Sequence, residues 1–424
     1  MKFFKNVIGA LLAARLVAGK PIYQRAAAFN YGVTPVRGYL NPGLRVSIFM
    51  MMMMMLLLFE LPSIFQNVDQ SLGIVDEFTL TAQLGPEKAL EILQPHWDKW
   101  CTLDDFQKIA NAGFNLVRIP IGYWAYALYD GETYTQGAAP YMDAAIDWAR
   151  QTGLKVWIDL HGAPGSQNAF DNSGHRKATP GWQQGDTVAQ TLEVLNTITQ
   201  KYAQTSYQDV VVGIELLNEP ANWALNFDTL EQFYRDGYGQ VRAVSDSPVI
   251  IHDAFYQPDT WNNILNPGDN GATNVVVDHH EYQVFSNSLV AMSGSQHIDF
   301  VCNNSHTYAN TDKFVIVGEF TAAMTDCAFA LNGYGVGARY DGTYPGSTNV
   351  ASCAGINNIN TWNATYKADV KNYLYAQLAA FETKAQGWIF WNFKTEGAHE
   401  WDALVLADNG MWPDLRGERF VAMC

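Results

Sequence analysis

The sequence predicts an α/β fold, a (β/α)8 TIM barrel that forms a single domain. Three observations support this prediction. Short apolar runs of strand length alternate with longer segments of helical periodicity, eight such runs can be counted, and no long linker divides the 424 residues. Parallel strands joined through helices have right-handed crossovers, and eight such units are enough to close a barrel.

The clearest strand lies in residues 210–220, VVVGIELLNEP. Its β-branched and aliphatic residues are typical of a strand buried on both faces, and it stops before Pro220, since proline cannot donate to a sheet ladder. The other predicted strands are 115–120, 155–160, 248–252, 274–278, 314–319 and 387–391. The predicted helices are 103–112, 141–152, 187–204, 227–244 and 367–384.

The first strand of the predicted barrel is atypical. It falls in residues 48–59, IFMMMMMMLLLF, and flexible methionine side chains specify packing poorly. Two interpretations stay open: a buried first strand, or a sequence that does not represent the functional protein. A third interpretation, weaker than these, is an element that associates with a membrane, although the run is shorter than the roughly 20 residues that span a bilayer.

Composition and the N-terminus bound the function. The net charge of −16 disfavours nucleic acid as a partner, because phosphates would be repelled. Residues 1–19 carry Lys2 and Lys5 before an apolar segment that ends in small residues, which predicts a secretory signal peptide ahead of a domain over 20–424. Asn303 and Asn363 lie in glycosylation sequons, in agreement with secretion.

The five cysteines fit two disulfide bridges and one free thiol in an oxidising compartment. They show no CxxC spacing. Asp278 and His279 could be metal ligands beside His280, but no HExxH or similar spacing accompanies them. We therefore expect no metal and no cofactor.

Side chains capable of binding or catalysis stand at the ends of most predicted strands. The carboxyl ends of parallel strands meet at one rim of a barrel, where the loops converge on ligands. We therefore expect one site built from Arg118, His161, Asn218, Glu219, His280, Tyr282, Glu319 and Trp391.

Two carboxyl groups in such a site suit the cleavage of glycosidic bonds. One carboxyl protonates the departing oxygen, and the other attacks the anomeric carbon or activates water. Glu219 and Glu319 supply this pair; two close carboxylates do not ionise easily together, so one should stay protonated as the acid. Arg118 and Tyr282 would hold the other carboxyl in its charged form.

Three neighbouring side chains have expected roles of their own. Asn218 is suited to hydrogen-bond a sugar hydroxyl, and Trp391 to form a platform beneath that sugar. Glu215 shares the strand and face of Glu219 but would lie about 13 Å deeper, which predicts pairing with a buried base rather than a part in the reaction.

Residues 61–424 resemble glycoside hydrolase family 5, and within it the fungal exo-β-1,3-glucanases. The motifs that carry the resemblance are LLNEP, DLHGAPGSQNAFDNSG, VVVDHHEYQVFS and FWNFKTEGAHEW. The resemblance implies that Glu219 is the acid/base and Glu319 the nucleophile. It places the other strand-end residues named above in the substrate site, adds Asn172, and makes Phe170 and Phe285 an aromatic clamp at the entrance.

The same resemblance implies bridges between Cys302 and Cys424 and between Cys327 and Cys353, which leaves Cys101 as the free thiol. The chain departs from the family pattern at the first strand. In the family a Gly-Gly-Trp segment normally leads there to a Glu-Pro that binds sugar hydroxyls. Here the methionine and leucine run takes that place, and the nearby Glu60 has the wrong spacing for the family's glutamate.

The sequence thus predicts a secreted or wall-associated retaining exo-β-1,3-glucanase, a monomer without a membrane span. It would release glucose from the non-reducing ends of β-glucan oligosaccharides or polysaccharides. Two alternatives stay open. One is another family 5 β-glucanase, such as one that cleaves β-1,6 bonds. The other is a glucan-binding wall protein that has lost catalysis.

Overall fold

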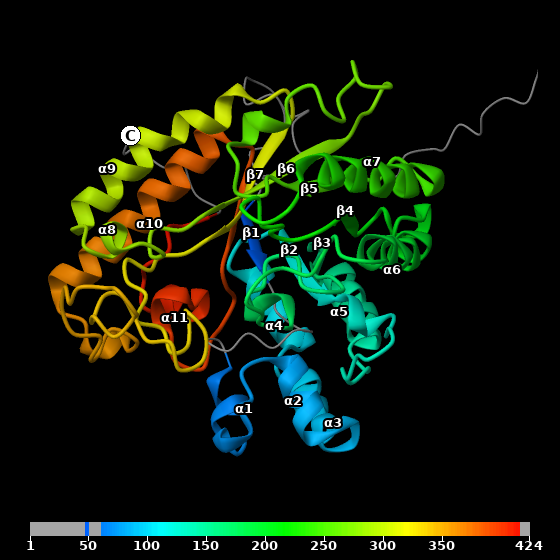
Figure 1. Cartoon of the computed structure of the whole chain (residues 1–424). Coiled ribbons are helices and arrows are strands. Elements are labelled where there is room, and N and C mark those ends of the chain that lie inside the picture. The colour runs from blue at the N-terminus through cyan, green and yellow to red at the C-terminus, as the bar shows by residue number, and fades with distance from the viewer. Residues whose placement is uncertain (1–46, 51–60, 416–424) are drawn as a thin grey trace, which may run out of the picture.

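The computed structural model describes residues 47–50 and 61–415, and its eight parallel strands form a closed barrel in sequential order (Figure 1). The strands are β1 (Ser47–Met50), β2 (Leu116–Gly122), β3 (Lys155–Gly162), β4 (Val211–Glu215), β5 (Val249–His252), β6 (Val275–Glu281), β7 (Phe314–Phe320) and β8 (Trp388–Phe390). The predicted fold is therefore confirmed.

Helices such as α4 to α7, α9 and α10 surround the barrel, whereas α1, α2 and α3 lie below it in Figure 1; the bounds of all the described helices follow. They are α1 (Pro62–Gln66), α2 (Glu77–Leu84), α3 (Pro86–Lys99), α4 (Leu103–Asn111), α5 (Ala139–Thr152), α6 (Thr187–Tyr202), α7 (Phe227–Val244), α8 (Asn287–Val290), α9 (Gly294–Asn304), α10 (Ala364–Lys384) and α11 (Ala403–Asp408). Local capping fixes several ends: Asn226 accepts from the Thr229 amide at the start of α7, and Asn363 accepts from the Tyr366 amide at the start of α10.

The first strand is present despite its unusual sequence. β1 pairs in parallel with β2 on one side and with β8 on the other, with Ile48 opposite Leu116 and Ile389. Of the predicted run 48–59, residues 51–59 lie outside the described part of the chain, as do Glu60 and residues 1–46 with the predicted signal peptide. The closure of the barrel supports the strand interpretation for residues 48–50.

The barrel interior is layered. An apolar layer of inward-facing side chains fills its lower part: Leu116, Trp157, Val212, Ile250, Val276, Ile316 and Ile389. Two residues further along several strands, the side chains become charged or polar, as Arg118, Asp159, His252 and Asp278. Because side chains alternate along a strand, this second layer lies above the first, toward the C-terminal rim.

A long loop joins β7 to α10 and is tied by a disulfide bridge. Cys327 and Cys353 are bonded, as the resemblance implied. Within the loop the buried Asp326 accepts hydrogen bonds from the backbone amides of Arg339 and Tyr340, at 2.7 and 3.0 Å. The other implied bridge involves Cys424, which lies outside the described residues; Cys101 is a buried free thiol, as predicted.

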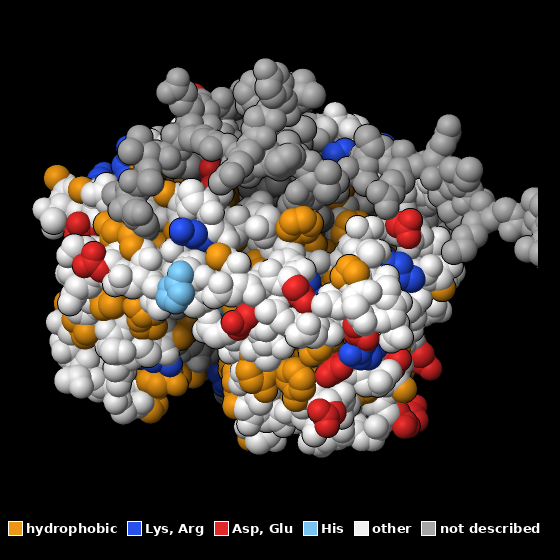
Figure 2. All heavy atoms as spheres, turned by 90° about the horizontal axis from the view of Figure 1, so that it is seen from above, with side chains coloured by type: hydrophobic (Ala, Val, Ile, Leu, Met, Phe, Trp, Pro, Cys, Tyr) orange, Lys and Arg blue, Asp and Glu red, His pale blue; other side chains and the backbone are white. Residues whose placement is uncertain are grey.

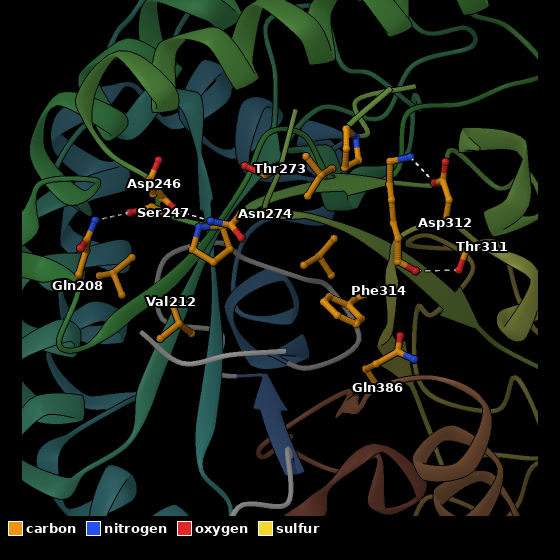
Figure 3. A pocket seen from close by; sticks show the side chains of 16 residues that line it. Gln208, Val212, Asp246, Ser247, Thr273, Asn274, Thr311, Asp312, Phe314 and Gln386 are labelled. Atoms are coloured by element: carbon orange, nitrogen blue, oxygen red, sulfur yellow. Dashed lines mark hydrogen bonds and ion pairs between the residues drawn. The ribbon is translucent and has the colours of Figure 1, made fainter. Parts of the chain in front are cut away.

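A cavity of about 450 Å3 lies at the N-terminal ends of the strands, whereas the predicted site residues lie at the C-terminal ends; Figure 3 shows the side chains that line the cavity. It is lined by residues at the N-terminal ends of β4 to β7, including Val212, Asn274 and Phe314. Figure 3 also shows Gln208, which donates to Ser247 at 3.4 Å across one side of it. None of the predicted site residues lines this cavity.

One face of the molecule carries acidic and basic side chains scattered among apolar and uncharged ones (Figure 2). Among the helices in the described part of the chain, none combines the length and the apolar character needed to cross a bilayer. The sequons fall on exposed positions: Asn303 near the end of α9, and Asn363 just before α10.

Candidate active site

The structure brings the predicted strand-end residues together at the C-terminal rim. Arg118, His161, His280 and Glu319 lie on strands β2, β3, β6 and β7, and Tyr282 and Trp391 directly follow β6 and β8. Asn218 and Glu219 lie beyond the end of β4, because this strand stops at Glu215. The hydrogen bonds described below connect most of these side chains into one network.

The Glu319 carboxylate is held by two donors. Arg118 Nη1 donates to Oε1 at 2.8 Å, and the Tyr282 hydroxyl donates to Oε2 at 2.8 Å. Both contacts were expected from the sequence. They fix the orientation of a carboxylate that is only 5% exposed.

The Glu219 carboxylate is held by one side chain from the loop after β3 and one from β6. Asn172 Nδ2 donates to Oε2 at 2.9 Å, and His280 Nδ1 lies 2.8 Å from Oε1. The backbone of Glu219 has φ of 44°, a conformation that costs energy for a residue with a side chain. Strained backbone conformations are common at functional sites, where they orient a side chain, and this agrees with a functional role for Glu219.

His280 joins the two carboxylates. Its Nδ1 lies 2.8 Å from Glu219 Oε1 and 3.4 Å from Glu319 Oε2. These two oxygens are therefore no further apart than the sum of the two distances, 6.2 Å. On its other side, His280 Nε2 lies 3.2 Å from Asp278 Oδ2.

The electrostatics of this group differ in one respect from the sequence expectation. Burial disfavours a charge on His280, but Glu319, Asp278 and Glu219 outweigh it and raise its pKa well above the ordinary value. Burial would raise the pKa of Glu219, yet the hydrogen bond and charge of His280 lower it. The pKa of Glu319 is raised, chiefly by burial, against the opposing charges of His280 and Arg118.

In the free site the proton that the acid requires therefore lies on His280. The sequence predicted this proton on Glu219. The reason is geometric, since both ring nitrogens of His280 face carboxylates and an imidazolium can donate to both. Movement of the Nδ1 proton across the 2.8 Å hydrogen bond would convert Glu219 into the neutral acid.

Asn218, His161 and Trp391 form the wall beside Glu219. Asn218 is fully buried; its Oδ1 accepts from Arg118 Nη2 at 2.8 Å, and its Nδ2 lies 3.3 Å from His161 Nε2. The indole ring of Trp391 stacks on the His161 ring, with centroids 5.7 Å apart. The platform expected at Trp391 is thus held in place by a neighbouring member of the predicted site.

Exposed aromatic rings lie on the loops around the site. The predicted clamp residues Phe170 and Phe285 are 42% and 44% exposed. The sequence did not single out Trp223, which is 58% exposed and lies 6.0 Å from the Phe170 ring, or Phe255, which lies 5.3 Å from Trp223. Their positions four residues after Glu219 and three after His252 would have been the signal.

Glu215 was predicted to lie about 13 Å deeper than Glu219, and the structure places it against Arg118. Its Oε2 lies 2.7 Å from Arg118 Nη2, while Nη1 of the same guanidinium binds Glu319. The estimate assumed a straight strand up to Glu219, whereas β4 ends at Glu215 and the chain turns. The predicted pairing with a buried base is confirmed, and that base, Arg118, also binds Glu319.

Sequence reasoning also missed the part that three buried polar residues play beneath the site: Asp159, His252 and Asp278. Asp159 and Asp278 form ion pairs with Arg118. Asp159 and Asp278 stand two residues before His161 and His280, and so face the same way. That spacing was the available signal.

One group in the site has the composition of a metal site: ligand atoms of Glu219, His252 and His280 lie within 4.8 Å of one another. However, His252 Nδ1 accepts the Ala254 amide at 2.9 Å, so the neutral ring carries its proton on Nε2. Since His280 is also engaged at both nitrogens, a cation would have to displace existing hydrogen bonds. The hydrogen-bonded arrangement fits these residues better than a metal.

Comparison with known proteins agrees with this geometry. Residues 85–337 match the family model described as cellulase (glycosyl hydrolase family 5). A glucan 1,3-beta-glucosidase of Blumeria graminis is 44% identical over 95% of this chain and 92% of its own length. Proteins of the same name from Yarrowia lipolytica and Candida oleophila are 43% and 46% identical, over 97% and 84% of this chain and 97% and 85% of their own length.

The chain belongs to glycoside hydrolase family 5. Among solved structures, this family 5 chain is similar to the rutinosidase from Aspergillus niger, with a TM-score of 0.68, 17% identity, and coverage of 88% of this chain and 99% of that one. At that identity the likeness concerns the fold alone. The family assignment therefore rests on the sequence matches, and the structural likeness adds support for the barrel fold.

Proposed function

We propose that the chain is a secreted, retaining exo-β-1,3-glucanase that releases glucose from non-reducing ends of β-glucan. The single observation that carries the mechanism is the position of His280 Nδ1 between Glu219 and Glu319, which limits their nearest oxygens to 6.2 Å. Retaining enzymes hold their carboxyl groups about 5 to 5.5 Å apart, whereas inverting enzymes leave roughly 6.5 to 9.5 Å for a water. The limit favours retention.

In the proposed reaction, Glu319 attacks the anomeric carbon while Glu219 protonates the glycosidic oxygen. The bond from the anomeric carbon to that oxygen breaks, and a glucosyl ester of Glu319 remains. Water then attacks the same carbon, Glu219 takes its proton, and Glu319 leaves as a carboxylate. The hydrogen bonds from Arg118 and Tyr282 favour the charged form of Glu319 that both ends of this cycle require.

The substrate assignment is supported by the relatives, which are named glucan 1,3-beta-glucosidase. The exposed rings of Phe170 and Phe285 support a clamp on a sugar at the entrance, since flat aromatic faces pack on the apolar faces of sugar rings. Exo action follows if this clamp narrows the entrance to a pocket.

Secretion is supported by the character of residues 1–19 and by the Cys327–Cys353 bridge, because disulfides persist in oxidising compartments. We further propose that the mature enzyme acts as a monomer at the cell wall.

Azide rescue tests the roles of the two carboxylates. In Glu219→Ala, an aryl β-glucoside with a good leaving group should still form the glucosyl ester, and azide should release it as β-glucosyl azide. In Glu319→Ala, azide should instead replace the nucleophile and give α-glucosyl azide. The same anomer from both variants, or unchanged turnover of laminarin by Glu219→Gln, would remove the assignment.

Product analysis tests the substrate. Glucose as the first product from laminarin, with little release from pustulan, is the expected outcome. Preferential cleavage of pustulan would favour a β-1,6-glucanase, and binding without release of glucose would favour a wall protein without catalysis.

A further inference from the structure

Arg118 contacts more carboxyl groups than one positive charge can balance. Its fully buried side chain lies 3.1 Å from Asp159, 2.7 Å from Glu215, 3.5 Å from Asp278 and 2.8 Å from Glu319. Charge-assisted hydrogen bonds also come from Arg118 Nε to Glu215 at 2.8 Å and from Nη1 to Glu319 at 2.8 Å. If all four carboxyls were ionised, this layer would hold an excess of buried negative charge, which is costly.

Histidine rings contact two of these four carboxyl groups. His161 Nδ1 lies 2.7 Å from Asp159, and His280 Nε2 lies 3.2 Å from Asp278. His252, which also faces this layer, has its pKa lowered well below the ordinary value by burial and by cationic neighbours, so it stays neutral. Among the described residues Glu215 makes no hydrogen bond with a histidine; its hydrogen-bond donor is Arg118.

Two of the carboxyl groups stand side by side. Asp159 and Glu215 are direct partners in the register of β3 with β4, and both are fully buried. Each has one oxygen bound to Arg118 and one buried oxygen, Asp159 Oδ1 and Glu215 Oε1, that accepts no hydrogen bond within the described part of the chain. An ionised oxygen in that situation carries the full desolvation cost, whereas one hydrogen between the two groups would satisfy both.

We propose that Glu215 is a neutral carboxylic acid whose Oε1 hydrogen is donated to Asp159, so that a carboxyl–carboxylate pair lies beneath the reacting glutamates. Glu215 is then a positioning residue. Its Oε2 accepts from Arg118 without adding a charge, and the guanidinium remains available to Glu319. This last step rests on the proposed function, in which Glu319 reacts as a carboxylate.

The electrostatics agree with this assignment. Burial, with the charges of Asp159 and Asp278, raises the pKa of Glu215 well above its ordinary value despite Arg118. The pKa of Asp159 is lowered: burial would raise it, but Arg118, His161 and a hydrogen bond with Glu215 outweigh burial. The charged and titratable groups that face Glu215 are Arg118, Asp159, Asp278, His280 and Tyr234 of α7.

Infrared difference spectroscopy of the full chain tests the protonation directly. A protonated carboxyl has a C=O stretch that carboxylates lack. At about pH 8, the wild-type spectrum should contain one such band that the spectrum of Glu215→Gln lacks. Loss of a carboxylate band instead would overturn the proposal.

A matched control is Glu400→Gln. Glu400 is also buried, but burial raises its pKa only to about 7, against hydrogen bonds from Tyr366 and Thr325. Its carboxyl band should therefore fade as the pH rises through neutrality, while the Glu215 band persists. A Glu215 band that fades over the same range would also overturn the proposal.

The pH profile of kcat/KM gives a second readout. Replacing a neutral acid by glutamine leaves the charge near Glu219 and Glu319 unaltered, so the limbs of the profile should stay within about 0.3 unit of wild type. Asp159→Asn removes a real negative charge and should move them to lower pH. A comparable shift in Glu215→Gln would show that Glu215 is ionised, against the proposal.

Should Glu215→Gln fail to fold, the wild-type chain with ¹³C in its glutamate carboxyl carbons keeps the test available. An isotope-shifted C=O band that persists at about pH 8 is expected, and its absence contradicts the proposal. Because the spectra require no turnover, an inactive chain that shows the band would refute the proposed function but not the carboxyl–carboxylate pair.

Discussion

Asn172 Nδ2 lies 2.9 Å from Glu219 Oε2, so the loop after β3 donates a hydrogen bond to the carboxylate that follows β4. This donor favours the charged form of Glu219 and is one cause of its lowered pKa, after burial, which opposes it, and His280. The contact gives Asn172 a direct influence on the acid of the proposed reaction.

We expect Asn172→Ala to raise the pKa of Glu219, because the charged form loses a donor. The alkaline limb of kcat/KM, which reports loss of the proton shared by His280 and Glu219 in the free enzyme, should move to higher pH by up to about one unit, with about a tenfold loss at the optimum. The measurement is the pH profile on laminarin. Asn172→Asp is the matched variant, and its added negative charge should move the limb further; a shift to lower pH in either variant would contradict the prediction.

Gly318 of β7 leaves the space that Asp278 occupies. A Cβ at this glycine would lie 1.8 Å from Asp278 Oδ1 and 2.4 Å from its Cγ. Because Asp278 contacts both Arg118 and His280, displacing it disturbs the charged layer. We expect Gly318→Ala to lower the free energy of unfolding by about 1–3 kcal/mol and to lower kcat/KM as well.

Urea unfolding measures this effect, and Gly239→Ala is its control. Gly239 lies within α7, and a Cβ there meets nothing within 4 Å. That substitution should stabilise the chain by about 0.5–1 kcal/mol, since alanine favours a helix over glycine. Equal effects of the two substitutions would mean that the space beside Asp278 does not matter.

The elements of the fold were largely predictable because hydrophobic periodicity and capping act locally. The helix predicted over 227–244 has those bounds as α7. The strand predicted from residue 274 begins one residue later, after Asn274, whose φ of 56° is outside the extended region although its carbonyl accepts from the Val249 amide. Asparagine adopts this conformation more readily than most residues with a side chain, so its place before the apolar run was the available signal.

The site was predictable where a side chain follows an apolar strand, as with Glu219 and Glu319. The charged layer beneath the site was not predictable in the same way. The neighbours of Asp159 and Asp278 depend on the register of β3 with β4 and of β6 with β7, which the sequence does not show. The surroundings of Glu215 were not predictable for a related reason: the chain turns after β4, so that Glu215 and Asn218 both bind the Arg118 guanidinium.

His297 of α9 makes stability depend on pH. It is fully buried, its Nδ1 lies 2.8 Å from Gln283 Oε1, and burial lowers its pKa to about 4. The unfolded chain, with a pKa near 6.5, binds a proton that the folded chain does not, so stability is full above about pH 6.5 and falls as the pH drops toward 4.

We expect this histidine to cost about 2–3 kcal/mol of stability between pH 7 and pH 4.5. Urea unfolding at both pH values measures the difference, and His297→Leu should reduce it by that amount. The variant also leaves Gln283 without this partner, but that loss is similar at both pH values. An identical pH dependence in wild type and variant would exclude His297 as the cause.

The Cys327–Cys353 bridge closes a loop of 26 residues in sequence separation after β7, the strand that carries Glu319. We expect the double variant Cys327→Ser, Cys353→Ser to lose about 2–4 kcal/mol of unfolding free energy, mainly because the unfolded chain gains freedom. The loop should keep its folded form at low temperature, since Asp326 still binds the amides of Arg339 and Tyr340.

Thermal unfolding and proteolysis within residues 328–352 measure the global and local effects separately. Cys101→Ala, which changes a buried thiol outside any bridge, is the control. Rapid cleavage in the loop well below the melting temperature would show that the bridge, rather than Asp326, holds the loop in the native state.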